Sequence, residues 1–251
     1  MKSEEVDGGP ATAGDPGGRA MDDFRDVKVM VTGACGFLGK RIVEGFESKG
    51  AEVVSLDLQL GHDLCDEAAV RAIFATHADA RVLINAFAIN PTPEQPSETM
   101  FDISLASLEQ YTQVNLVAAF SCCREFARNA GDGSSIVNFS SIYGVRAPKH
   151  FIYPEGYTKH IGYTMTKAGV IGMTQYLASY LAPRIRVNAV APGGVQANQD
   201  PDFVAKYSQV TPMGRMLERD ELLGALYYLA SDYASYTTGT VMNVDGGWTI
   251  W

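Results

Sequence analysis

The stretch Thr32-Gly33-Ala34-Cys35-Gly36-Phe37-Leu38-Gly39 decides the fold. It follows an apolar run, Val27–Thr32, and opens an amphipathic helical pattern near Phe37–Lys49. Glycines let the backbone turn tightly and approach a pyrophosphate, whose negative charge then faces the N-terminus of the following helix. A strand, a glycine turn and a helix in this order predict the first unit of a dinucleotide-binding fold. The residues of the turn expected to contact a dinucleotide are Gly33, Gly36, Phe37, Leu38 and Gly39.

Short apolar runs continue to alternate with helical patterns along the rest of the chain. The helical patterns include two long segments, 103–130 and 161–182, and the further expected strands are Glu52–Asp57, Val82–Ala86, Ser135–Ser140, Ile185–Ala191 and Val241–Asp245. This alternation predicts an α/β fold, a Rossmann-type doubly wound parallel sheet of about seven strands flanked by helices. At 251 residues the chain is short for two domains, so we expect a single domain over 23–251. Residues 1–22 are rich in glycine and poor in large apolar groups, and we expect a disordered tail.

Composition excludes several classes of partner. The formal net charge of -9 and the lack of a basic run argue against nucleic acid and anionic membranes. No apolar segment approaches the ~20 residues that a membrane-spanning helix needs, and the first residues lack the order of a signal peptide. The four cysteines have no CxxC spacing, so we expect no metal site and reduced thiols in a cytoplasmic protein.

Asp57 ends the second expected strand and bears on the choice of dinucleotide. A carboxylate at this position can accept hydrogen bonds from an adenosine ribose diol, and it repels a 2′-phosphate. Neither Cys35 nor Leu58 provides the cation that would hold such a phosphate. The sequence therefore favours NAD(H) over NADP(H).

Tyr163 and Lys167 form the candidate proton-transfer pair. A four-residue step on a helix places the phenol and the ammonium on one face, about 6 Å apart. Free tyrosine has a pKa near ~10, so transfer near neutrality needs a shift of roughly 2–3 units. A neighbouring cation supplies much of that shift by stabilising the phenolate.

With these two sites, the chain from Val27 to its C-terminus resembles the short-chain dehydrogenase/reductase family. Further matches occur in family order: Asp63-Leu64, Asn85-Ala86-Phe87-Ala88, Val114-Asn115-Leu116, Ile136-Val137-Asn138-Phe139-Ser140-Ser141, Ile185 to Gly193, and Val244-Asp245-Gly246-Gly247. The resemblance implies that Ser141 orients a substrate carbonyl and that Asn115 holds a water behind Lys167. It implies that Tyr163 is the general acid or base, while Lys167 lowers its pKa and holds the nicotinamide ribose. Further cofactor contacts implied in this way are Asp63, Leu64, Asn85, Ala86, Pro192, Gly193 and Val195.

The chain departs from the family pattern at several places. Asn85-Ala86-Phe87-Ala88 replaces Asn-Asn-Ala-Gly, and the glycine spacing resembles that of the longer, nucleotide-sugar-modifying branch. The threonine that commonly follows the Pro-Gly motif is replaced near Ala197. Ser141 lies 22 residues before Tyr163, which leaves room for an inserted segment, 145–161. The Ser-Ser-Ile-Tyr-Gly run and the Asp-Gly-Gly-Trp-Thr ending resemble reductases of nucleotide-activated and nonulosonic sugar pathways.

The inserted segment carries aromatic and cationic residues that suit a polar substrate, although an ordinary surface loop explains them equally well. The candidate substrate contacts are Lys149, His150, Tyr157 and, after the Pro-Gly motif, Asn198.

Three functions remain open. The first is an NAD(H)-dependent dehydrogenase or reductase of a secondary alcohol or ketone on a sugar-derived or related polar metabolite. The second is a dehydratase or epimerase of a nucleotide-linked sugar that uses NAD transiently, and the third is a non-catalytic NAD-sensing module.

Apolar residues around the two long helices, together with the resemblance, predict a homotetramer or a dimer. The residues expected at that interface are Leu108, Val114, Val117, Phe120, Val170, Met173, Tyr176, Leu177 and Tyr180.

Overall fold

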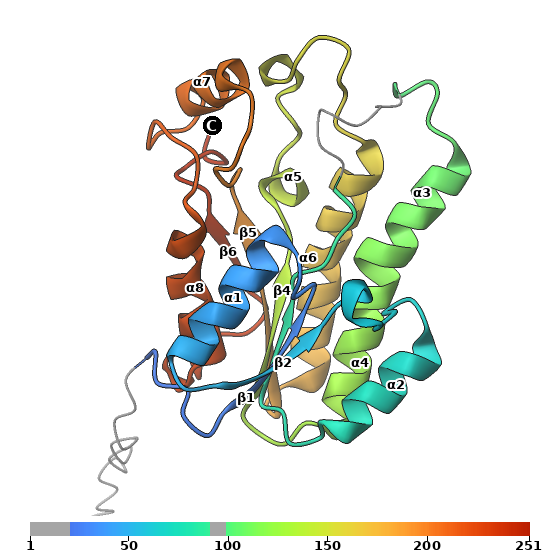
Figure 1. Ribbon diagram of the computed structural model, residues 1–251, viewed down its shortest axis with the longest axis vertical. Helices are drawn as coiled ribbons and strands as arrows, with labels where there is room; N and C mark the ends of the chain where they lie inside the picture. The colour runs from blue at the N-terminus through green and yellow to red at the C-terminus, as the bar shows by residue number, and fades with distance from the viewer. Residues whose placement is uncertain (1–20, 91–98) are drawn as a thin grey trace, which may run out of the picture.

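The computed structural model describes residues 21–90 and 99–251, so all but the last two residues of the predicted tail lie outside the described residues. The described chain forms one parallel sheet with the strand order β2-β1-β3-β4-β5-β6 (Figure 1). The strands are β1 (Lys28–Thr32), β2 (Glu52–Leu56), β3 (Val82–Asn85), β4 (Ser134–Phe139), β5 (Ile185–Pro192) and β6 (Val241–Val244). Each lies within one or two residues of its predicted position, which confirms the Rossmann-type fold.

The prediction of about seven strands is wrong, because the sheet of the described residues has six. The sequence itself located only these six, and β2 lies at one edge of the sheet. After β2 the chain makes only a short 3-10 turn, η1 (Leu58–Leu60), before helix α2 (Glu67–Thr76) begins. This connection is too short to hold another strand and its crossover helix.

Helices cover both faces of the sheet (Figure 1). On one face, α1 (Phe37–Ser48) and α8 (Leu223–Ala230) pack on an apolar core. On the other, α2, α4 (Ala119–Asn129) and α6 (Ile161–Leu181) bury a second core. The short elements are α5 (Ile142–Val145), α7 (Pro201–Gln209), η3 (His150–Ile152), η4 (Arg219–Leu222) and η5 (Asp232–Ala234). No helix in these described parts is both long and apolar enough to cross a bilayer.

The long helical pattern predicted over 103–130 is broken into three consecutive segments. α3 (Leu105–Thr112) continues into a π-helical segment, η2 (Gln113–Ala118), and then into α4. π-helical segments inside α-helices are often found at functional sites, and this one contains Asn115.

Candidate functional site

The predicted site residues come from different parts of the sequence but gather at one edge of the sheet. All strand pairings are parallel, so β1, β3, β4 and β5 end together. Ligands bind at this carboxyl edge in open α/β sheets. The glycine turn follows β1 and Ser141 follows β4.

The glycine turn has a shape that only glycine can give. Gly33 has φ +72°, and a Cβ added to it would lie 2.8 Å from the backbone of Phe87. A Cβ on Gly39 would lie 1.9 Å from the carbonyl oxygen of Gly33. Gly36 begins α1 without a side-chain cap, so the first N–H groups of the helix face the edge of the sheet. The turn therefore fits a dinucleotide pyrophosphate, which these groups would hold.

Two other residues predicted in this turn lie beside it. Phe37 is about half exposed and lies under the guanidinium of Arg219, which is 4.8 Å from the ring centre. Leu38 packs partly against the core under α1. Both lie in the first turn of α1, where a bound dinucleotide would pass.

Asp57 lies directly after β2, beside the glycine turn. One carboxylate oxygen accepts a hydrogen bond from the backbone N–H of Cys35 at 3.0 Å, and the other accepts from Gln59 N–H at 2.9 Å. The carboxylate is thus fixed where a ribose diol would meet it. Asp63 accepts from the N–H of Cys65 at 2.9 Å, and Leu64 is buried in the core.

Asn85 is part of a buried polar network within the sheet. Its Nδ2 donates to Asn138 Oδ1 at 2.9 Å and to the sulfur of Cys123, while Thr32 Oγ1 donates to its Oδ1 at 3.1 Å. These contacts tie β1, β3 and β4 together. Ala86 packs against the apolar core beneath α1 and α8. Because the side chain of Asn85 is engaged in this network, a contact with a cofactor would have to come from its backbone atoms.

Tyr163 and Lys167 lie near the beginning of α6 and are buried, with 9% and 3% of their surfaces exposed. The Lys167 Nζ is 5.7 Å from the centre of the Tyr163 ring and donates to the carbonyl oxygen of Phe139 at 2.7 Å. Burial lowers the pKa of Lys167 to about 8. The structure thus brings the predicted pair together, with the ammonium anchored at the end of β4.

Ser141 completes this arrangement from the strand side. It caps the short helix α5, where its Oγ accepts from the N–H of Tyr143 at 3.2 Å. Burial raises the pKa of Tyr163, and a hydrogen bond with the Ser141 hydroxyl partly opposes that shift. A hydroxyl, a phenol and an ammonium thus meet at the carboxyl edge, which is a set able to move a proton to or from a substrate oxygen.

Asn115 is held by backbone atoms. Its Oδ1 accepts from Ile89 N–H at 2.7 Å, and its Nδ2 donates to Ile89 O at 3.1 Å and to Thr166 Oγ1 at 3.3 Å. Asn115 therefore connects the π-helical segment, the loop after β3 and the helix that carries Tyr163. The water-holding role that the resemblance implies stays a prediction.

The candidate substrate residues differ in their placement. Lys149 lies with its ammonium 4.8 Å from the centre of the Trp248 ring, and the Tyr157 ring lies 5.0 Å from that of Tyr153. Both are thus part of one aromatic cluster with Tyr163. His150 and Asn198 are exposed.

Sequence reasoning missed most of that cluster. Its rings come from α5, the insertion, α7 and the chain end, and the hydroxyl groups of Tyr143 and Tyr153 are 2.6 Å apart. Tyr207 stacks on Trp248, and its hydroxyl accepts from the Gly194 N–H at 2.6 Å. In the sequence, this cluster is indicated only by the aromatic residues near Tyr163 and by the tryptophan of the Asp-Gly-Gly-Trp ending.

Comparisons with known proteins agree with this geometry. A family model described as enoyl-(acyl carrier protein) reductase matches residues 28–249. A short-chain type dehydrogenase/reductase of Sinorhizobium fredii is 33% identical over 91% of this chain. The matched region covers 45% of the length of that relative. The chain belongs to the short-chain dehydrogenase/reductase family. Members of this family are oxidoreductases that act on CH–OH groups.

Two further relatives carry information on ligands. A protein of Rhizobium meliloti named "probable galactose dehydrogenase" is 31% identical over 90% of this chain and 96% of its own length. The crystal structure of a short-chain dehydrogenase from Leptospira borgpetersenii with bound NAD⁺ is 32% identical, covers 91% of this chain and 95% of its own, and superposes with a TM-score of 0.80.

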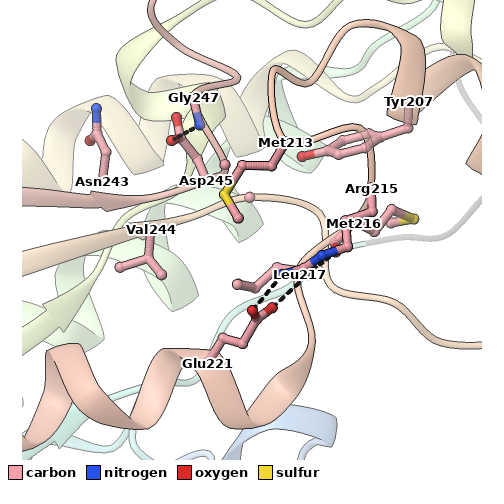
Figure 2. A pocket seen from close by; sticks show the side chains of 12 residues that line it. Tyr207, Met213, Arg215, Met216, Leu217, Glu221, Asn243, Val244, Asp245 and Gly247 are labelled. Carbon is pink, nitrogen blue, oxygen red and sulfur yellow. Dashed lines mark hydrogen bonds and ion pairs between the residues drawn. The ribbon is translucent and has the colours of Figure 1, made fainter.

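In this short-chain dehydrogenase/reductase, a cavity of about 470 Å³ lies beside the end of β5, lined by residues that include Gly193 and Asp245 (Figure 2). Gly193 and Tyr207 line the cavity, and an ion pair of Arg215 and Glu221 crosses it at 2.6 Å. Ser141, Tyr163 and Lys167 are not among its lining residues. Pro192 ends β5, and Val195 forms a bridge with Leu217, which fixes the segment that follows.

Proposed function

We propose that this enzyme is an NAD(H)-dependent dehydrogenase or reductase that interconverts a secondary alcohol and a ketone on a polar, sugar-derived metabolite. The observation that carries the proposal is the buried Tyr163, which forms a hydrogen bond with the Ser141 hydroxyl and has the Lys167 ammonium 5.7 Å from its ring centre, at the carboxyl edge of the sheet. A phenol in this position serves as base for oxidation and as acid for reduction.

Each side chain has a separate task. Ser141 donates a hydrogen bond to the substrate oxygen and stabilises negative charge that develops there. Tyr163 takes the hydroxyl proton in oxidation and returns it in reduction. Lys167, which is anchored on the Phe139 carbonyl, favours the phenolate and would hold the nicotinamide ribose. The bound nicotinamide supplies hydride transfer.

The choice of NAD(H) rests on the glycine turn and on Asp57. The turn accommodates a pyrophosphate, and the carboxylate beside it accepts from ribose hydroxyls but repels a 2′-phosphate. The NAD⁺ bound in the Leptospira relative supports the same choice.

The insertion supports a polar, ring-shaped substrate. It contributes Tyr153 and Tyr157 to the aromatic cluster that contains Tyr163, and its Lys149 lies over the Trp248 ring of the same cluster. Aromatic faces pack against the C–H groups of a sugar ring, and phenol hydroxyls bind its hydroxyl groups. The relative named for galactose supports this class.

We further propose a homotetramer in the cytoplasm. Tyr176 and Tyr180 on α6 are 66% and 73% exposed and stack on each other, and Phe120 lies partly exposed on α4, so these helices offer an apolar face to another copy. Val170 and Leu177, which the sequence placed on this face, are buried in the enzyme itself. All four cysteines are free thiols, as expected in a reducing compartment. Light scattering at micromolar concentration tests the assembly.

The proposed reaction is tested with purified enzyme and NAD⁺ against galactose, other sugars and polyols, and with NADH against 3-oxoacyl thioesters. We expect formation of NADH with a polyhydroxylated substrate, and a loss of more than tenfold in kcat for Tyr163→Phe with NAD⁺ binding retained. A loss of under tenfold, about 1.4 kcal/mol, would refute the role of Tyr163. Conversion without net change in NADH would favour a dehydratase or epimerase, and NAD⁺ binding without any conversion would favour a sensor.

A further inference from the structure

A second lysine lies against the catalytic tyrosine. Lys159 is in the insertion, four residues before Tyr163, and only 7% of its surface is exposed. Its Nζ lies over the Tyr163 ring, 4.7 Å from the ring centre, compared with 5.7 Å for the Nζ of Lys167. A hydrogen bond from Nζ to Asn90 Oδ1, on the loop after β3, fixes the position of the ammonium.

A cation over the face of this ring affects the two protonation states differently. A neutral phenol attracts the cation through its ring quadrupole, whereas a phenolate also carries negative charge that is delocalised onto the ring carbons. The ammonium therefore stabilises the ionised tyrosine more than the neutral one, and this lowers the pKa of Tyr163. Because both side chains are buried, solvent screens the interaction weakly.

We infer that Lys159 is a positioning residue that acts through Tyr163, where its ammonium holds the ring and favours the phenolate in addition to the ammonium of Lys167. The inference rests on the proposed oxidoreductase function. It gives the insertion a task in proton transfer, in addition to any contact with substrate.

The other groups around Tyr163 do not replace this contribution. Within 21–90 and 99–251, Ser141 provides a hydrogen bond and Lys167 a second cation, while Tyr143 and Tyr153 are close enough to interact electrostatically with Tyr163. Both of these phenols carry no charge near neutrality, because burial raises the pKa of each. Burial lowers the pKa of Lys159 to about 8, so its ammonium is charged, and acts on Tyr163, at pH values below about 8.

The test is the pH dependence of kcat/KM for NAD⁺-dependent oxidation in wild type, Lys159→Met and Lys159→Arg. In this direction activity rises with pH as Tyr163 loses its proton. Methionine removes the charge of Lys159 but keeps the length of the side chain. The rising limb of the kcat/KM profile should therefore move to higher pH by about one unit, so that kcat/KM falls about tenfold at low pH and returns to the wild-type value at high pH. Arginine retains the charge and should leave the limb within about 0.3 unit of wild type.

A matched control comes from a second lysine of the insertion whose ammonium lies over a buried aromatic ring. Lys149 lies over Trp248 instead of Tyr163, so Lys149→Met should leave the limb in place whatever happens to KM. A limb for Lys159→Met that coincides with wild type overturns the inference. So does a rise in KM at every pH with an unmoved limb, which would make Lys159 a substrate contact only.

A second readout needs no turnover. Ultraviolet difference titration of each protein against the same protein carrying Tyr163→Phe gives the pKa of Tyr163 itself, which should rise by about one unit in Lys159→Met. If the enzyme turns over no substrate, the proposed function fails while this titration still decides the inference. An unchanged tyrosine pKa overturns it in either case.

Discussion

Replacing Gly39 by alanine tests whether the glycine turn is built for a pyrophosphate. The added Cβ would lie 1.9 Å from the carbonyl oxygen of Gly33, 2.8 Å from its carbonyl carbon and 2.9 Å from the Cα of Ala34. All of these are backbone atoms, which cannot rotate away as a side chain can. Relief therefore requires a shift of about 1 Å between the turn and the start of α1.

Such a shift has two measurable costs. Overpacking of this kind destabilises a protein by ~1–3 kcal/mol, which lowers Tm by roughly 2–4 °C per kcal/mol in a domain of this size. The displaced N–H groups should also weaken NAD⁺ binding by at least tenfold, or about 1.4 kcal/mol. Calorimetric titration with NAD⁺ and thermal unfolding without ligand measure the two effects separately.

Two other glycines serve as controls for this prediction. A Cβ on Gly36 would meet only the Gly33 oxygen at 3.2 Å, so Gly36→Ala should fold and weaken NAD⁺ binding less than Gly39→Ala does. Gly131 lies after α4 with nothing within 4 Å of its added Cβ, so Gly131→Ala should change neither quantity. Wild-type affinity in both Gly39→Ala and Gly36→Ala would refute the assignment of this turn to the cofactor.

The remaining predictions concern cofactor choice and the insertion. NAD⁺ should be preferred over NADP⁺ by at least tenfold in kcat/KM. The double variant Asp57→Ala, Leu58→Arg should narrow or reverse this preference, because it removes a repelling carboxylate and adds a phosphate-binding cation. Equal use of both cofactors by the wild type would show that Asp57 does not face the ribose. Lys149→Ala should raise KM for a polar substrate more than it lowers kcat, whereas His150→Ala, at an exposed position, should change KM less. Unchanged initial-rate kinetics in both variants would assign the insertion to the surface.

Most of the fold could be predicted because strand and helix periods differ strongly along this chain. The runs before Gly33 and before Ser141 are buried on both sides, as expected for central parallel strands. The number of strands could not be predicted in this way. Only six runs could be located along the chain, and the short stretch after Asp57 forms a turn.

The placement of the candidate site residues was predictable where side chains recur at a fixed spacing or follow directly after a strand. Tyr163, Lys167 and Ser141 belong to this kind, and the structure brings them together. Partners supplied by backbone atoms leave no trace in the sequence, so neither the Ile89 peptide that holds Asn115 nor the Phe139 carbonyl could be found. The aromatic cluster was missed because Tyr207 and Trp248 are distant in the sequence from the rings around Tyr163 and meet them only through tertiary packing.

The same backbone contacts explain how this enzyme tolerates its departures from the family pattern. Asn115 bonds both the N–H and the carbonyl of Ile89, and Ser140 Oγ donates to the carbonyl of Lys167 at 2.8 Å. These partners exist whatever side chains the loop after β3 carries, as long as its backbone keeps its path. The hydrogen-bond network of Asn85 and the close approach of Phe87 to Gly33 fix the path of this backbone. The placement of Asn115 beside the loop therefore depends on the backbone of Ile89, whereas the placement of Lys159 depends on the side chain of Asn90.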